Sequence, residues 1–491
     1  MRNLFLITIA ALTIFTQLIL FRSGARKDID IRDADIILNW ATYPHFTRYD
    51  QAKLFREWLK KNGHPNIAMR IDGANIGAQK AVVQGVTGVA ADVIDNLQGS
   101  DVHFLHDVGL LADLTDMAKK FGHESNYYPG AVDDVFIDGR RYAYHGNIGV
   151  GLYYVNKAAF EKVGIAPPPF RNDFQTFRNV GLEYTRRANK GVKRQEYFYA
   201  GGADREVIRR TAGVSWFNET LTRGGLDNPR YAEVLKHIHR WTFEDHILPT
   251  AAEISSFAID QGVGGPIFQL FYRGNFAMMY TGIWAIMQLR VMGKGIEMSA
   301  VEPPNGGYPV TMLSGRCIVM YQGTKQREAA EYFYKFLGSS DYNMNIIAVG
   351  DSSPPDPAYL ERTEFLKPVG YTNEWEIHEI YARAQKANGQ GREYSPFASA
   401  SVYLKEDNQS YTGFMSGIYT AEKAAEIANG VVNKEIDRYL RIHPERMTEY
   451  NKALERQKKI DEAKKAGKKI PLNLVDNTFL KRYYRDTGLG E

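Results

Sequence analysis

The segment DGRRYAYHGNIGVGLYYVNKAAFEKVGIAPPPF, from Asp138 to Phe170, concentrates aromatic side chains around a glycine-spaced stretch. It holds four tyrosines and one histidine, and each ring combines an apolar face with a polar tip. Such rings suit a half-solvated groove, and the alternative is a buried strand with a glycine bulge. Glycines at 146, 149 and 151 leave room for a second backbone or a ligand to approach closely.

Two other motifs suggest chemistry but lack what that chemistry requires. DVHFLHD places His103 and His106 between Asp101 and Asp107, yet no glutamate stands in the position of a general base. GNIGVG is a poor dinucleotide-binding loop because a strand follows it, whereas such a loop must open a helix. The sequence contains no serine elbow and no phosphate loop, so we expect no metal and no cofactor.

The composition excludes several classes of protein. A chain of 491 residues exceeds a usual single core and predicts two domains or lobes. Its 44% hydrophobic and 24% charged residues are ordinary for a globular protein. The formal charge of +4 is nearly balanced, so nothing indicates a nucleic-acid partner. Cys317 is the single cysteine, so no internal disulfide can form.

The N-terminus predicts export. An apolar run from Leu4 to Phe21 follows one arginine and precedes three basic residues. Its length lies between that of a secretory apolar region and that of a membrane-spanning helix. Residues 1–29 are therefore predicted to be a signal peptide or an N-terminal membrane anchor. We expect the body at the periplasmic or extracellular face of the membrane, tethered by this segment, with a cleaved soluble form as the alternative.

Strand and helix patterns alternate along the first part of the chain. A buried strand is predicted at 36–38 in ADIILNWAT, followed by a loop YPHFTRYD and a helix QAKLFREWLKKNG. PNIAMRID and AADVIDN read as further strands, and HFLHDVGLLADLTDMAKKFG as one helix. The middle is more helical, and GRCIVMYQGTKQREAAEYFYKFLGS returns to a strand and then a helix. This order predicts an open α/β sheet and a chain that leaves one lobe and re-enters it.

The opening segment resembles the lobe crossover of extracellular solute-binding proteins of sugar-type ABC importers, the maltose-binding-protein-like family. That family has a DGK-YG-P turn before a YNK--F---G---PP strand and helix, and here Asp138, Gly139 and Tyr142, then 154–167, correspond. AADVIDN with GLLADLTD, YRGNFAMMYTGIW and REAAEYFYKFL follow in the family's order. The chain departs from the family in lacking a lipid-anchoring cysteine and the common tryptophan after the prolines. The stretch 445–491 also extends beyond it.

The resemblance implies an α/β, two-lobed periplasmic-binding-protein (type II) fold with a ligand cleft between the lobes. The implied division is 30–145 plus 314–380 for lobe 1, 146–313 plus 381–460 for lobe 2, and 461–491 as a C-terminal extension. The chain would cross near Gly146 and Ser314, and glycine-rich crossings can absorb the rotation of a hinge. Loops after IILNW, AADVI and RRYAYH should face the cleft, because ligands bind beyond the carboxyl ends of strands in such sheets.

A sugar site needs aromatic plates and planar hydrogen-bonding groups, because a sugar presents C–H faces and a rim of hydroxyls. The rings that we expect at the ligand, several of them in segments matching the family's contacts, are Trp40, Tyr43, Tyr144, His145, Trp216 and Trp284. Asp95, Asn96 and Arg316 could bind hydroxyl pairs. The alternatives are core packing for each ring, and a turn cap or an ion pair for each polar group.

Two classes of function remain open. The first is a non-catalytic, monomeric receptor that captures a mono- or oligosaccharide and delivers it to the permease subunits of an ABC importer. The second is an exported polysaccharide-acting enzyme, which would need two carboxylates facing each other across the sugar. Within the receptor class, a non-sugar ligand such as a polyamine would be favoured by a strongly acidic cleft, or by clustered tyrosines without tryptophan.

Overall fold

The structure is a computed structural model that describes residues 29, 31–191, 196–200, 205–256, 265–292 and 295–491. The predicted signal peptide or anchor lies outside the described residues, apart from Ile29. Within the described part of the chain, no helix is both long enough and apolar enough to cross a membrane.

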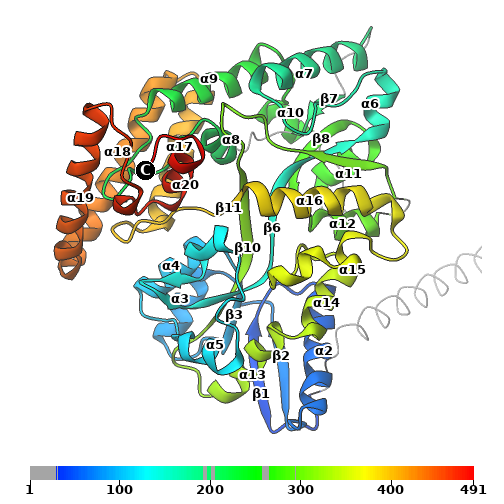
Figure 1. The fold of residues 1–491 in the computed structure, drawn as a ribbon. Helices are drawn as coiled ribbons and strands as arrows, with labels where there is room; N and C mark the ends of the chain where they lie inside the picture. Colours follow the sequence, from blue (N-terminus) through cyan, green and yellow to red (C-terminus); the bar gives the residue numbers. More distant parts are fainter. Residues whose placement is uncertain (1–28, 30, 192–195, 201–204, 257–264, 293–294) are drawn as a thin grey trace, which may run out of the picture.

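A nine-stranded mixed sheet runs through both lobes (Figure 1), in the order β2-β1-β3-β10-β6-β8-β7. Two short partners join it, because β9 pairs with β6 and β11 pairs with β10. The strands are β1 (Ile36–Ala41), β2 (Ile67–Asp72), β3 (Val93–Leu97), β6 (Ala143–Asn156), β7 (Tyr197–Tyr199), β8 (Phe276–Gly282), β9 (Met298–Val301), β10 (Thr311–Met320) and β11 (Gly389–Gln390). A separate hairpin pairs β4 (Phe136–Ile137) with β5 (Arg140–Arg141).

The first lobe is built on β1, β2, β3 and one end of β10, and its strands alternate with helices as the sequence predicts. Its helices are α2 (Phe46–Lys61), α3 (Ala78–Val86), α4 (Gly99–Asp107), α5 (Thr115–Phe121), α13 (Arg327–Leu337) and α14 (Ser340–Val349). Leu38 and Trp40 of β1 pack against Phe55 of α2 and Phe333 of α13 in its core. Burial of these large apolar side chains stabilises the packing of α2 and α13 on the sheet.

Two helix boundaries in this lobe differ from the sequence-based expectation. The stretch predicted as one helix is divided into α4 and α5, because Gly109 adopts φ 72°, a conformation that ends a helix. The predicted loop YPHFTRYD contains the first turn of α2, which begins at Phe46. This turn brings Arg48 to the edge of the lobe, where it lines the cleft.

The second lobe carries most of the remaining helices around β7, β8, β9 and the far half of β6. They are α6 (Lys157–Val163), α7 (Phe174–Ala188), α8 (Arg205–Thr211), α9 (Pro229–Phe243), α10 (Ala251–Ser256), α11 (Gly265–Arg273), α12 (Ala285–Val291), α15 (Thr363–Leu366), α16 (Trp375–Asn388), α17 (Ala400–Met415) and α18 (Ala421–Ile442). Residues 357–380, assigned from the sequence to lobe 1, pack here instead. Phe365, Ile377 and Ile380 share a core with Ile286 of α12, because α16 lies across β6 and β9.

Three connections join the lobes. In Figure 1, β6 and β10 run between the lower and the upper lobe, and they pair antiparallel from Ala143↔Val319 to Val150↔Leu313. The third connection follows α14, where Ile148 exchanges two backbone hydrogen bonds with Ser353, at 3.1 and 2.9 Å. The strand β6 therefore contacts both other connections.

The C-terminal segment 447–491 packs on the second lobe, including residues 461–491, which the sequence analysis separates as a C-terminal extension. It contains α19 (Met447–Lys465) and α20 (Thr478–Asp486), drawn in red in Figure 1. The buried Glu219 accepts hydrogen bonds from Lys464 Nζ and Tyr484 Oη, both at 2.5 Å. Phe479 packs with Tyr308, next to the start of β10. The sequence of α19 does not indicate this packing, because most of the helix is charged and only a narrow face of it is buried.

Candidate functional site: a cleft between the lobes

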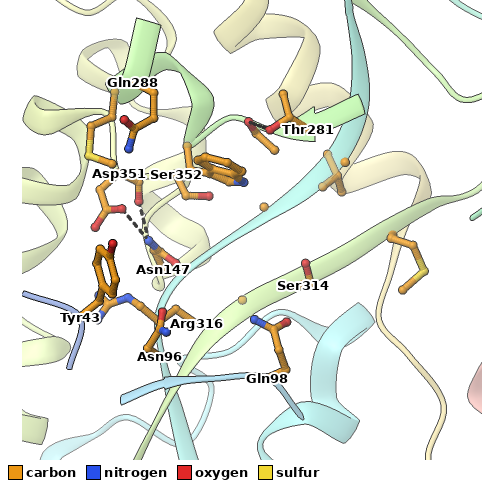
Figure 2. A pocket seen from close by; sticks show the side chains of 18 of the residues that line it. Tyr43, Asn96, Gln98, Asn147, Thr281, Gln288, Ser314, Arg316, Asp351 and Ser352 are labelled. Carbon is orange, nitrogen blue, oxygen red and sulfur yellow. Dashed lines mark hydrogen bonds between the residues drawn. The ribbon is translucent and has the colours of Figure 1, made fainter. Parts of the chain in front are cut away.

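A cavity of about 580 Å³ opens between the two lobes where the connecting strands cross. Its walls come from the loop after β1, the end of β3, the middle of β6 and β10, the end of β8, α12 and the segment after α14. In Figure 2, Gln288 and Thr281 lie on one side of this cavity and Asn96 and Gln98 on the other. The cleft thus receives polar side chains from both lobes.

One edge of the cleft is held by a buried ion pair. Arg48 of α2 donates through Nη1 to Asp351 Oδ2 at 2.5 Å. Asn147 of β6 donates through Nδ2 to the backbone oxygen of Asp351 at 2.8 Å and to its Oδ1 at 3.0 Å, as Figure 2 shows. Burial alone would raise the pKa of Asp351, but the charges of Arg48 and Arg316 lower it overall. This carboxylate is therefore ionised at neutral pH.

A second polar network lies beneath the floor of the cleft. Arg316 of β10 forms a buried ion pair with Asp95 of β3 and donates through Nη2 to Tyr342 Oη at 2.8 Å. Tyr342 in turn donates to the backbone oxygen of Gly146 at 2.7 Å. A Cβ at Gly146 would lie 2.5 Å from Arg316 Nη2, so this glycine makes room for the guanidinium. The network joins β3, β10, α14 and β6 where β6 and β10 pass from one lobe to the other.

Two exposed aromatic rings face the cleft from different lobes. Tyr43 follows β1 in the first lobe and is 56% exposed, and Trp284 precedes α12 in the second lobe and is 40% exposed. Phe268 of α11 supports Trp284, with the two ring centroids 5.5 Å apart. Each ring offers a flat apolar face to a ligand.

The remaining glycines of the opening segment also have a steric reason. A Cβ at Gly149 would lie 2.8 Å from Ser352 Oγ, and one at Gly151 would clash with the ring of Tyr280. Ser352 and Tyr280 both line the cleft. The predicted close approach at these glycines is thus to side chains of neighbouring segments, within a strand.

The structure brings four of the nine predicted site residues to the cleft. Tyr43, Asn96, Trp284 and Arg316 line it, and Asp95 lies just behind, held by Arg316. Asn96 adopts φ 60° at the end of β3. This left-handed conformation is one that asparagine tolerates, and it ends the strand at the cleft.

Two predicted tryptophans belong to the core instead. Trp40 is fully buried and packs against Phe333, with ring centroids 5.3 Å apart. Trp216 is 4% exposed and lies between Tyr403 of α17 and the guanidinium of Arg209 of α8. We expected Trp40 to follow the strand, but β1 continues to Ala41. Trp40 therefore lies on the same buried face of β1 as Leu38.

Tyr144 and His145 are also placed away from the cleft. Both lie inside β6 and are almost fully buried. The guanidinium of Arg141 covers the ring of Tyr144 at 3.8 Å, and His145 Nε2 lies 3.7 Å from Asp134 Oδ2. In place of the loop predicted after RRYAYH, β6 is a continuous strand, and its pairing with β10 directs both side chains into the first lobe.

Several cleft residues are not predicted by the sequence analysis. They are His45, Arg48, Gln98, Asn147, Tyr280, Thr281, Gln288, Asp351 and Ser352. For Gln98 a signal exists, since it directly follows AADVIDNL at the carboxyl end of a strand. Arg48 and Asp351 offered none, because they lie far apart in the sequence and meet only through the fold.

A smaller cavity of about 400 Å³ continues the cleft toward α8 and α17. It shares Gln98, Tyr280, Met312 and Ser314 with the first cavity. Its charged lining residues are Asp134, Arg205, Glu206 and Arg392, and Arg392 donates through Nε to Glu206 at 2.8 Å. The continuous groove is therefore longer than the first cavity alone and carries little net charge.

The motif DVHFLHD has a structural explanation. The ring of His103 bonds to the backbone oxygen of Asp133 at 2.8 Å, and that of His106 packs against Tyr142. Among the described residues, no group of three or more His, Cys, Asp or Glu side chains is arranged to hold a metal ion.

The sequence profile of the bacterial extracellular solute-binding proteins matches residues 43–344. The chain belongs to this family. The resemblance inferred from the sequence is thereby confirmed, as is the expectation of a non-enzymatic solute-binding protein rather than an enzyme. The family description also indicates an exported protein. No curated protein matches the sequence significantly.

Solved structures of solute-binding proteins share the fold. A Listeria monocytogenes ABC substrate-binding protein in complex with cycloalternan is 20% identical, with a TM-score of 0.67 over 81% of this chain and 98% of that one. A Thermotoga lettingae solute-binding protein bound with α-D-tagatose is 17% identical, with a TM-score of 0.67 over 82% and 100%. Maltose-bound MalE3 of T. maritima is 15% identical, with a TM-score of 0.64 over 82% and 99%. These likenesses confirm the predicted two-lobed α/β periplasmic-binding-protein fold.

Proposed function

We propose that this solute-binding protein captures an oligosaccharide in the cleft, without altering it, and delivers it to the permease subunits of an ABC importer. The observation that carries the proposal is the pairing of Tyr43 and Trp284, exposed rings from separate lobes in one cleft. Amides of Asn96, Gln98 and Gln288 surround them and suit sugar hydroxyls. The neighbours named above, which hold cycloalternan, tagatose and maltose, support a carbohydrate ligand.

The length of the groove favours an oligosaccharide over a monosaccharide. The smaller cavity extends the cleft past Tyr280 toward Tyr411 of α17, so rings occur along the whole groove. The guanidinium of Arg205 lies 4.3 Å from the centre of the Tyr411 ring. A chain of neutral sugar units can stack on such rings without needing a charged partner.

The charges of the cleft argue against the two alternatives. Among the described residues of the first cavity, Asp351 is the only carboxylate, and it is held by Arg48. A glycosidase would need a second carboxylate facing it across the sugar. The carboxylates of the smaller cavity are already bound, Glu206 by Arg392 and Asp134 by Tyr394. A polyamine would require an acidic cleft, whereas Arg48 and Arg316 make this one basic or neutral, and Trp284 adds an indole.

Calorimetric titration with maltotriose, maltotetraose, cyclic maltodextrins and monosaccharides tests this function, together with chromatography of the sugar afterwards. We expect saturable binding of at least one oligosaccharide, tighter than that of its monosaccharide unit, and recovery of the sugar unchanged. Cleavage of the sugar, or binding of polyamines in place of any saccharide, would overturn the proposal.

We further propose that the protein is monomeric and tethered outside the cytoplasm by its N-terminal segment. The proposal rests on the apolar run from Leu4 to Phe21 and on the exported family. N-terminal sequencing of the mature protein tests the tether. We expect the chain to begin before Leu4, and a start near Arg26 would show that the segment is cleaved.

A further inference from the structure

A cavity of about 950 Å³ lies behind the crossing strands, and we call it the rear cavity. Along β10, Met312 and Ser314 line the first cavity of the cleft, whereas Leu313 between them lines the rear cavity and also the smaller cavity that continues the cleft. Successive side chains of a strand point to opposite faces of a sheet. The first cavity and the rear cavity are therefore on opposite sides of the strands that join the lobes.

The walls of the rear cavity come from three parts of the molecule. They are η1 (Pro129–Asp134), which contacts α4 of the first lobe, the second-lobe segments 357–361 and 385–390, and α20 of the C-terminal segment. Arg482 of α20 donates through Nη1 to the backbone oxygen of Gly389 at 3.1 Å. Thr478 of α20 donates through Oγ1 to Asp133 Oδ2 at 2.8 Å. The C-terminal segment thus closes one side of a cavity that spans the hinge.

Two buried amides in this cavity have unused hydrogen-bonding atoms. Gln385 and Gln390 are each 4% exposed. Among the described residues, neither Nε2 of Gln385 nor Oε1 of Gln390 has a hydrogen-bond partner. The amide oxygen Oε1 of Gln385 accepts a hydrogen bond from Ser353 Oγ at 3.0 Å, and this bond orients the amide. Because buried polar groups are normally paired, a donor and an acceptor are available here to a bound molecule.

The charge of the rear cavity is positive. Its charged lining residues are Glu361, Lys386, Lys481, Arg482, Arg485 and Asp486. Lys386 pairs with Glu361, and Arg482 and Arg485 share Asp486. Lys481 forms no ion pair with any residue that the structure describes. An anionic group would be stabilised beside Lys481 and Arg485.

We propose that the rear cavity is a second binding site, for a small hydroxylated carboxylate of the sugar-acid class. Its carboxylate lies toward Lys481 and Arg485, and its hydroxyls reach the amides of Gln385 and Gln390. Leu313 and Leu360 supply an apolar wall for its carbon chain. The site depends on α20, which lies outside the part of the chain matched by the family profile.

Occupation of the rear cavity strengthens sugar binding in the cleft. A rotation that opens the cleft on one side of the crossing strands narrows the space on the other side. A molecule that fills the rear cavity resists this narrowing and so favours the closed cleft, and by linkage the sugar favours the rear ligand equally. This coupling rests on the proposed function, because it needs lobes that close on a sugar.

Calorimetry of the purified full-length protein with gluconate, glucuronate and neutral glucose tests the site directly. We expect saturable binding of an acid but not of glucose, weakened about tenfold by Lys481→Gln or Gln385→Leu, since each removes a direct hydrogen bond. Lys468→Gln, at an exposed lysine outside the cavity, is the matched control. The site is overturned if neither acid binds at millimolar concentration, or if the control weakens binding as much as Lys481→Gln.

The coupling is tested by titrating the oligosaccharide with and without saturating acid. We expect the acid to tighten sugar binding about fivefold or more, a usual size for coupling between sites. An unchanged sugar affinity while the acid is bound overturns the coupling. If no saccharide binds at all, the proposed function fails, while the direct titration of the acid still decides whether the rear site exists.

Discussion

Arg48 and Asp351 lie 303 positions apart in the sequence and form a buried ion pair at the edge of the cleft, with Nη1 and Oδ2 2.5 Å apart. Asn147 of β6 bonds to the same carboxylate. The pair joins α2 of the first lobe to the segment that follows α14 and to one of the crossing strands. It fixes the wall against which a ligand would rest, and it holds the one carboxylate among the described residues of the first cavity.

Replacing Arg48 by methionine should destabilise the protein. The substitution keeps most of the side-chain volume but leaves Asp351 buried without its cation, which typically costs about 3–5 kcal/mol. Chemical denaturation should show this loss, and the double variant Arg48→Met with Asp351→Asn should recover part of it. Equal stability of Arg48→Met and the parent would show that the ion pair contributes nothing to the fold.

The two tryptophans Trp284 and Trp40 should respond oppositely to alanine. Trp284→Ala should lower sugar affinity by about 1–3 kcal/mol through lost stacking and burial, with little change in stability. Trp40→Ala should cost about 3–5 kcal/mol of stability, because it leaves a cavity in the core. Calorimetry and thermal melts of both variants measure the two effects. A destabilised Trp284→Ala that still binds sugar as the parent does would place Trp284 in the core.

The same pair shows how far the sequence alone could lead. The alternation of strands and helices predicts the first lobe, and the ordered motifs predict the family and the crossover. Which tryptophan faces the ligand depends on where each strand ends, because β1 includes Trp40 whereas β8 ends at Gly282, before Trp284. An error of two residues in a strand boundary therefore exchanges a core residue for a site residue.

Long-range pairs were beyond prediction for a different reason. The meeting of Arg48 with Asp351 requires the third connection between the lobes, and the docking of the C-terminal segment depends on Glu219. A charged residue has the same sequence signature on a solvated surface and in a buried pair. Only the fold shows which carboxylates are buried away from solvent.

Gly151→Ala should weaken sugar binding more than it weakens the fold. The new methyl group would meet the ring of Tyr280, so this ring, which lines the cleft, would have to shift. We expect a loss of about 1–2 kcal/mol in affinity, comparable to overpacking a core. Gly430→Ala on α18 is the control, because a Cβ there would meet nothing within 4 Å. The idea fails if the two variants bind sugar equally well.

The stability of the protein should depend on pH through Asp133, which accepts a hydrogen bond from Thr478. Burial is the main cause that raises its pKa from 3.8 to about 6, with Asp134 and Glu393 adding repulsion and Arg210 opposing it. Because the folded pKa is the higher one, stability from this group is present below pH 3.8 and is lost as pH rises through about 6.

Asp133→Asn removes this titration while an amide oxygen can still accept from Thr478. Denaturation at several pH values should therefore show the variant gaining about 2 kcal/mol relative to the parent between pH 4 and pH 7. For Asp116→Asn, at a fully exposed carboxylate, the free energy of unfolding should change with pH as it does in the parent. A constant difference between Asp133→Asn and the parent across this range would rule out the raised pKa.

Small-angle X-ray scattering of the protein with and without a saturating oligosaccharide tests the central claim most directly. Tyr43 and Trp284 lie on separate lobes that the crossing connections join, so a ligand that touches both rings should draw the lobes closer. We predict a smaller radius of gyration with sugar for the parent, and no change at the same sugar concentration for Trp284→Ala. Sugar that binds the parent tightly while its radius of gyration stays constant, or that contracts Trp284→Ala equally, would contradict capture by closure of the cleft.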